Sequence, residues 1–163
     1  MLFDIKPLSI QDITSIITCI TVVLSAYYAF TQYKATRLSD SENALIKTYE
    51  FLQSRDFIIA RRYIFKHLAN KPFENWTDED IDNAETVCRN YDTAFLINEQ
   101  QGYENNLRKI SVKWNHSIIN SYKICKPLIL NYKSSRGGGF WNHFDKLHAL
   151  AGKVKTDNTD LIA

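Results

Sequence analysis

The chain has 163 residues, 45% of them hydrophobic, which is enough for one sizeable core and predicts one main domain. Its 20 Lys and Arg residues nearly balance 18 Asp and Glu residues, and a net charge of +2 does not indicate binding to duplex nucleic acid. The three cysteines, Cys19, Cys88 and Cys125, lie far apart without a CxxC pair, which argues against a zinc site or a disulfide framework.

The near-neutral total conceals a separation of charge along the chain. Between Glu74 and Tyr103, eight acidic residues accompany one basic residue, for a local charge of −7. Between Glu104 and Lys155, ten Lys or Arg residues accompany two acidic residues, for a local charge of +8. The basic half is therefore the part of the chain in which we expect an anionic partner to bind.

The first predicted element is an apolar helix over residues 13–30, ITSIITCITVVLSAYYAF, which contains no formal charge. At about 1.5 Å per residue it spans about 27 Å, close to the roughly 30 Å hydrocarbon thickness of a bilayer. We expect a transmembrane anchor over residues 1–38. Lys34 and Arg37 follow the run directly, so the positive-inside rule predicts a single-pass protein of a bacterial inner membrane, with its N-terminus outside and its C-terminal domain in the cytoplasm.

Two alternatives stay open for this run. A cleavable signal peptide normally has a basic start and small residues at its end, whereas Asp12 precedes this run and aromatic residues end it. A buried core helix would be equally apolar, although the rest of the chain carries a core pattern of its own. We therefore favour an uncleaved anchor in the lipid bilayer.

One face of the run is rich in small and hydroxyl-bearing residues at helical spacing. Such faces let membrane helices approach closely and bond to one another, which predicts self-association and a homo-oligomer. The alternative is that each hydroxyl bonds back to its own helix. The residues of this face are Thr14, Thr18, Thr21, Ser25 and Ala29.

Helical periodicity continues through residues 39–155, and we expect a flexible tail over residues 156–163. The stretch from Ser39 to Ala69 is interpreted as two helices or one bent helix, with an N-cap among Ser39, Asp40 and Ser41. Thr77 and Asp80 then predict the capping box of the next helix.

That acidic helix is expected to end at Gly102, and a basic one is expected over residues 104–125 with an interruption near Pro127. A last helix follows the glycines at 137–139. Strand-like alternation is scarce. The predicted fold class is all-α: an N-terminal transmembrane helix followed by a cytoplasmic bundle of five or six helices.

The basic helix predicts a ligand-binding stripe on one face. Its members fall four, three, four and three residues apart, a spacing that could follow several phosphates. The alternative is a solvated face, or one neutralised by the acidic helix before it. The predicted ligand-binding residues are Lys109, Lys113, His116, Asn120 and Lys123, with Arg61 and Arg62 as a second cluster.

The segment SSRGGGFWNHF, residues 134–144, holds three of the five glycines. Consecutive glycine amides can form an anion-binding concavity, but this run lacks the Lys and Ser or Thr of a phosphate loop. We interpret it mainly as a connector between two helices, in which substitution of Gly138 by Ala should cost stability. Arg136 precedes the glycines and is predicted to reach a ligand held by the basic stripe.

Catalysis is weakly supported, and we expect the protein not to be an enzyme. The four histidines are scattered, and His143 and His148 are spaced so that they do not share a helical face as metal ligands would. Nucleophile motifs, phosphate-binding loops and dinucleotide fingerprints are lacking. The sequence predicts no catalytic residue, no metal and no cofactor.

Several segments resemble an uncharacterised bacterial family of small single-span proteins with a helical cytoplasmic domain. The resemblance lies in ARRYIF (Ala60–Phe65), AETVCRNYDTAFLINEQQG (Ala84–Gly102), Trp114, and Arg136 followed by glycine and FWNHFDKLHALA. It implies architecture rather than activity, because the matching positions are mainly packing positions.

The layout also resembles the small membrane effectors of type III CRISPR systems, in which a transmembrane N-terminus carries a cytoplasmic domain that binds cyclic tetra-adenylate. This resemblance implies a tetramer that perturbs the membrane, and a cyclic oligoadenylate as ligand. It rests on size, topology and the basic stripe. The leading hypothesis is therefore an antiviral signalling effector, and the alternative is a structural or partner-binding inner-membrane protein without a nucleotide ligand.

Overall fold

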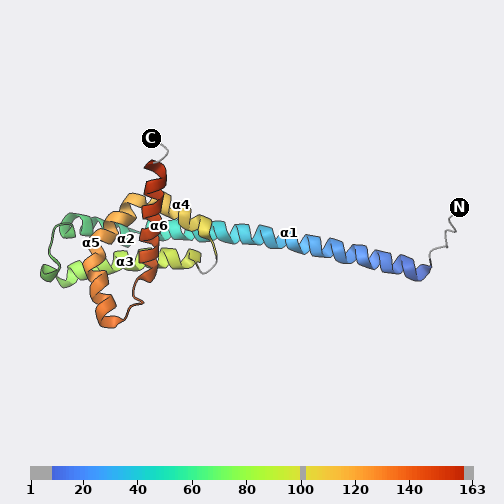
Figure 1. Ribbon diagram of the computed structural model, residues 1–163, viewed down its shortest axis with the longest axis horizontal. Coiled ribbons are helices and arrows are strands. Elements are labelled where there is room, and N and C mark those ends of the chain that lie inside the picture. Colours follow the sequence, from blue (N-terminus) through green and yellow to red (C-terminus); the bar gives the residue numbers. More distant parts are fainter. Residues whose placement is uncertain (1–8, 100–101, 160–163) are drawn as a thin grey trace. The chain divides into compact units, whose positions relative to one another are not determined.

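The computed structural model describes residues 9–99 and 102–159, and all of their regular structure is helical (Figure 1). The predicted all-α class, with one long apolar N-terminal helix before a helical domain, is confirmed. The chain divides into two compact units, residues 1–40 and residues 41–163. The elements are α1 (Ile10–Leu52), α2 (Arg55–Tyr63), the π-helical turn η1 (Ile64–Leu68), the 3-10 turn η2 (Phe73–Asn75), α3 (Asp78–Glu99), α4 (Glu104–Lys113), α5 (Asn115–Arg136) and α6 (Asn142–Thr159).

Helix α1 is continuous over 43 residues, so the prediction of a new helix starting between Ser39 and Ser41 is wrong. The reason is local: no Gly or Pro occurs between Pro7 and Pro72, and a capping residue cannot start a helix where the preceding turn is already helical. The apolar part of α1 has a mean hydropathy of 1.8 over 18 residues and is exposed, which makes α1 a candidate membrane span.

The hydroxyls of the predicted association face bond within α1. Thr14 Oγ1 donates to the carbonyl of Ile10 at 2.9 Å, and Thr18 Oγ1 and Thr21 Oγ1 donate to the carbonyls four residues earlier at 2.8 Å. These three donors are satisfied without a second helix, as the alternative explanation held. Self-association through Thr14, Thr18, Thr21, Ser25 and Ala29 therefore stays a prediction.

The core of the second unit surrounds α3, which contacts α2, α4, α5 and α6. Tyr91 of α3 lies at its centre: its ring meets Phe57 edge-on at 5.2 Å and stacks on Phe144 at 5.0 Å. All three side chains are fully buried. Because large aromatic side chains bury the most apolar surface, this stack holds α2, α3 and α6 together.

The basic segment is divided differently from the prediction. Helix α4 ends at Lys113 and α5 begins at Asn115, with Trp114 between them at φ −110° and ψ 13°. Pro127 lies inside α5 and does not interrupt it. Pro127 has no backbone N–H, so the carbonyl of Lys123, four residues earlier, lacks its helical hydrogen-bond donor. Both residues are exposed, so water can donate to that carbonyl instead.

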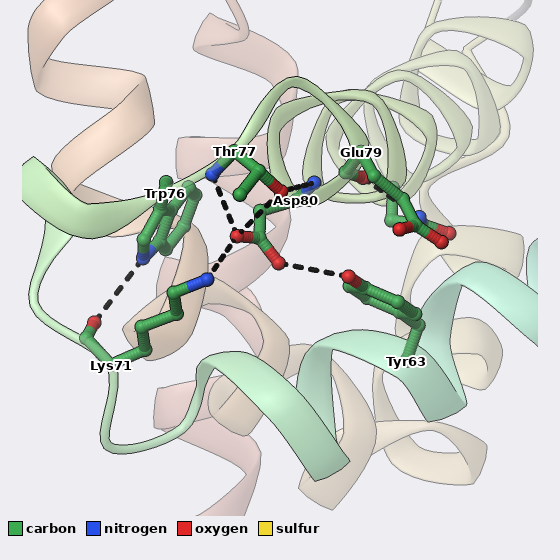
Figure 2. A network of polar contacts seen from close by, with 7 residues as sticks. Tyr63, Lys71, Trp76, Thr77, Glu79 and Asp80 are labelled. Carbon is green, nitrogen blue, oxygen red and sulfur yellow. Dashed lines mark hydrogen bonds and ion pairs between the residues drawn. The ribbon is translucent and has the colours of Figure 1, made fainter.

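Asp80 fixes the corner between η1 and α3, and the predicted capping box is confirmed (Figure 2). Its carboxylate accepts hydrogen bonds from Thr77 N at 2.7 Å, Tyr63 OH at 2.9 Å and Lys71 Nζ at 2.5 Å, although the residue is only 1% exposed. Burial alone would raise the pKa of Asp80, but the bonds from Lys71, Thr77 and Tyr63 outweigh it and hold the pKa well below its usual range.

The glycine segment is a connector, as interpreted, between the end of α5 at Arg136 and the start of α6 at Asn142. Gly137 has φ 107° and ψ 151°, a conformation that essentially only glycine adopts. Gly138 has no such φ, and a methyl group there would meet nothing within 4 Å. The conformational requirement therefore lies at Gly137, one residue before the predicted position.

Substitution of Gly137 by Ala is expected to lower the free energy of unfolding by about 2 kcal/mol, because the new side chain strains the backbone. The matched Gly138→Ala variant is expected to change it by less than about 0.5 kcal/mol. Urea unfolding of both variants, followed by tryptophan fluorescence, measures the difference. Equal effects at the two positions would show that the conformation of Gly137 is not required.

Candidate functional site

The predicted basic stripe is divided between two helices. Lys109 and Lys113 lie on α4, whereas His116, Asn120 and Lys123 lie on α5 beyond the non-helical Trp114. The prediction of one continuous helical stripe is therefore wrong. One residue outside helical geometry changes the direction and phase of the chain, so the spacing that aligned the five side chains does not apply across it.

The α4 part of the stripe lines an open groove of about 490 Å³, which we call the α4 groove. The amine of Lys113 lies 4.1 Å from the ring centroid of Tyr49, in cation–π geometry. Three positive charges and no carboxylate occur among the described lining residues. These residues are Tyr49, Asn105, Arg108, Lys109, Val112 and Lys113.

The amphipathic sequence of α4 positions these cations. Leu107 and Ile110 are buried in the core, while Arg108, Lys109 and Lys113 are exposed. The buried amide of Asn106 donates to the carbonyl of Ser41 at 2.8 Å, which ties α4 to the last turns of α1. The groove is therefore built from two segments that are far apart in the sequence.

The α5 part of the stripe is arranged differently. Asn120 Nδ2 lies 2.8 Å from His116 Nε2, so these two side chains bond to each other. Lys123 is exposed. Burial lowers the pKa of His148, Asp145 opposes this effect, and the charges of Lys123 and Lys126 lower the pKa further.

Arg61, from the second predicted cluster, is a packing residue in this structure. Its guanidinium donates to Ser117 Oγ at 3.3 Å and lies 5.3 Å from the ring centroid of Phe57 and 5.1 Å from that of Trp114. It therefore joins α2 to the junction of α4 and α5. Its neighbour Arg62 is exposed and makes none of these contacts.

Arg136 is not brought to the α4 groove. Its guanidinium lies 4.2 Å from the ring centroid of Tyr132 and 5.8 Å from that of Phe140, at the C-terminal end of α5. Helix α5 has 22 residues and places that end about 30 Å from the α4 junction. Within one chain, Arg136 therefore cannot share a ligand with Lys109, contrary to the prediction.

Three acidic residues of helix α3, Glu85, Asp92 and Glu99, bond to α5, to α6 or within α3. Glu85 accepts from Tyr132 OH and pairs with Arg89, and Asp92 accepts from the backbone N of Phe144 at 3.0 Å. The bond to Glu85 raises the pKa of Tyr132.

Glu99 pairs with Lys146 at 2.6 Å and with His143 at 3.0 Å, and Lys146 lowers its pKa. None of the ion pairs found among the described residues joins α3 to the lysines of α4. One alternative had proposed that the acidic stripe neutralises the basic one, but the described residues show no direct ion pair between α3 and the α4 groove.

Four lining residues of the groove, Tyr49, Asn105, Arg108 and Val112, were not predicted from the sequence. Arg108 precedes Lys109 and falls outside the spacing of the predicted stripe, although its exposure on an amphipathic helix could have been predicted. Asn105 lies one helical turn before Lys109 on α4. Tyr49 carried no signal, because only the tertiary structure brings α1 beside α4.

Among the side chains that the structure describes, within residues 9–99 and 102–154, no three His, Cys, Asp or Glu gather in a way that could hold a metal ion. In the α4 groove, Arg108, Lys109 and Lys113 offer three positive charges to an anion. No protein-family model matches the chain, and comparisons with curated proteins and with solved structures find no similar protein.

Proposed function

We propose that the chain is a single-pass membrane protein whose C-terminal helical domain binds an anionic nucleotide in the α4 groove. The ligand class is a cyclic oligoadenylate, and the role is that of an antiviral signalling effector that perturbs the membrane through associated transmembrane helices. The N-terminus would lie outside the bacterial inner membrane and the domain in the cytoplasm. The observation that carries the proposal is a groove with three cations and no described carboxylate.

The physical support is electrostatic. Arg108, Lys109 and Lys113 place three positive charges around one opening, and a phosphate diester placed there would make charge-assisted hydrogen bonds. Tyr49 and Val112 supply an aromatic and an apolar surface beside those charges. This combination suits a nucleotide better than an inorganic ion, because it provides for both a phosphate and a base.

The size of the groove bears on the oligomeric state. About 490 Å³ accommodates one nucleotide rather than a ring of four. A cyclic tetra-adenylate would therefore need one groove from each of four copies, in keeping with a homotetramer. To transmit a signal, such a ligand must bind one arrangement of the copies more tightly than another, because equal affinity shifts no equilibrium.

The test measures binding of labelled cyclic tetra-adenylate to the full chain in lipid nanodiscs. The double variant Lys109→Glu with Lys113→Glu is expected to bind more than about 100-fold more weakly, because the reversed charges repel the phosphates. The matched control, Lys66→Glu with Lys126→Glu, changes the net charge equally at exposed lysines outside the groove and should retain binding.

Two results would contradict the proposal. One is an absence of binding at micromolar ligand. The other is equal loss of affinity in both double variants, which would indicate non-specific attraction to the basic half. Co-purification of a stable protein partner, together with indifference to nucleotides, would instead support the alternative of a partner-binding inner-membrane protein.

A further inference from the structure

A second cleft lies on the other side of α4, between the C-terminal end of α3, α4 and α6. It has a volume of about 580 Å³, within the range of small-molecule sites. It shares only Asn105 and Arg108 with the α4 groove. Its described lining residues are Phe95, Glu99, Gly102, Tyr103, Glu104, Asn105, Leu107, Arg108, Ser111, Leu150, Lys153 and Val154.

The interior of this cleft is apolar. Phe95 and Leu107 belong to the buried core, and Leu150 and Val154 extend the surface along α6 as half-buried side chains. A surface of this kind favours the apolar body of a ligand by removing it from water.

One polar group in the wall has no partner. The hydroxyl of Ser111 is fully buried and forms no hydrogen bond with any described residue. A buried hydroxyl without a partner is unfavourable, so a ligand atom that accepts its proton would be stabilised. Ser111 lies three residues after Arg108 and therefore next to it on the surface of α4.

The opening carries a cation for an anionic ligand. Arg108 is exposed there and forms no ion pair with a described residue. Of the two acids that line the cleft, Glu99 already pairs with Lys146 and His143, and Glu104 is exposed. An incoming carboxylate would thus meet the guanidinium of Arg108.

We propose that this cleft binds a small carboxylic acid with an aromatic or aliphatic body. The carboxylate accepts a hydrogen bond from Ser111 Oγ and pairs with Arg108, while the body packs on Phe95, Leu150 and Val154. This second site shares Arg108 with the α4 groove, whereas Ser111, Phe95, Leu150 and Val154 lie outside that groove.

The test titrates the full chain in nanodiscs with 1-naphthaleneacetate by calorimetry, with empty nanodiscs subtracted. Saturable binding at one site per chain is expected, and 1-naphthaleneacetamide, which has the same body without the charge, should bind at least about 10-fold more weakly. Ser111→Ala should weaken binding of the acid by roughly 10-fold, because a hydrogen bond to a charged group is lost.

Val154→Glu places a carboxylate at the cleft and should weaken binding at least about 10-fold. Lys126→Gln, an exposed change of equal charge outside the cleft, should leave binding unchanged. Thermal unfolding followed by tryptophan fluorescence checks that Val154→Glu is folded, and Ser111→Ala provides the test if it is not.

Non-saturable uptake, equal affinity for the acid and the amide, or unchanged affinity in Ser111→Ala would overturn the proposal. The two proposed sites are separable. Lys109→Glu with Lys113→Glu should retain binding of 1-naphthaleneacetate, and Val154→Glu should retain binding of cyclic tetra-adenylate.

Discussion

Replacing Asp80 by Asn is expected to lower the free energy of unfolding of the C-terminal domain by about 3 kcal/mol. The carboxylate is 1% exposed and accepts bonds from Lys71, Thr77 and Tyr63, as Figure 2 shows. An amide in its place carries no charge for Lys71, and its NH₂ group would point a donor at another donor.

Tryptophan fluorescence during urea unfolding measures this loss, because all three tryptophans, Trp76, Trp114 and Trp141, lie in the second unit. Asp82→Asn is the matched control: the same change on the same helix at an exposed carboxylate, for which less than about 0.5 kcal/mol is expected. If both variants unfolded at the same urea concentration, the network around Asp80 would contribute nothing to stability.

The same carboxylate predicts a dependence on pH. The pKa of Asp80 is lower in the folded chain than its ordinary value of about 3.9, so its contribution is complete above that value and is lost as the pH falls below it. The difference in stability between the unmodified chain and Asp80→Asn should therefore shrink below about pH 4. A constant difference down to pH 2 would contradict this assignment.

Replacing Val22 by Arg is expected to remove the chain from membranes. Val22 lies at the middle of the 18-residue apolar run, where arginine is less favourable than valine by about 3 kcal/mol, a factor of more than about 100 in the insertion equilibrium. Because the run is only just long enough to cross, no shift along the helix can place the new charge outside the hydrocarbon.

The measurement is the fraction of full chain that stays in the membrane pellet after an alkaline carbonate wash. Val112→Arg, the same substitution at an exposed valine of the C-terminal domain, should stay with the membrane as the unmodified chain does. Equal retention of the two variants would show that residues 13–30 do not form the anchor. Extraction of the unmodified chain as well would favour the core-helix alternative.

Helix boundaries were predicted correctly where the signal lay within a few residues of the boundary. The capping box of Thr77 and Asp80 marks the start of α3, and Gly137 ends α5 through its own backbone conformation. Three boundaries were wrong: α1 continues through residues 39–41, Pro127 is accommodated on the exposed side of α5, and the chain breaks at Trp114 instead. An interior proline disfavours a helix, but exposure lets water replace the lost bond.

Two of the cations in the candidate site could be predicted from the sequence, but the positions of the two arginines could not. Lys109 and Lys113 were found as basic residues one turn apart on α4, since helical spacing is a local property. The packing of Arg61 on Trp114 and the distance of Arg136 from α4 could not be predicted, because both depend on which helices are neighbours.

Composition and periodicity act within a few residues, so they predicted the all-α class, the apolar run of α1 and the concentration of positive charge after Glu104. Which charges are available depends on how the helices pack. That packing engages Glu85, Asp92 and Glu99 of α3 with α5 and α6, leaves the cations of α4 exposed, and sets Tyr49 beside Lys113. The physical reason is that pairing of charges and the shape of a groove depend on contacts between helices, and those contacts follow from burial of the whole core.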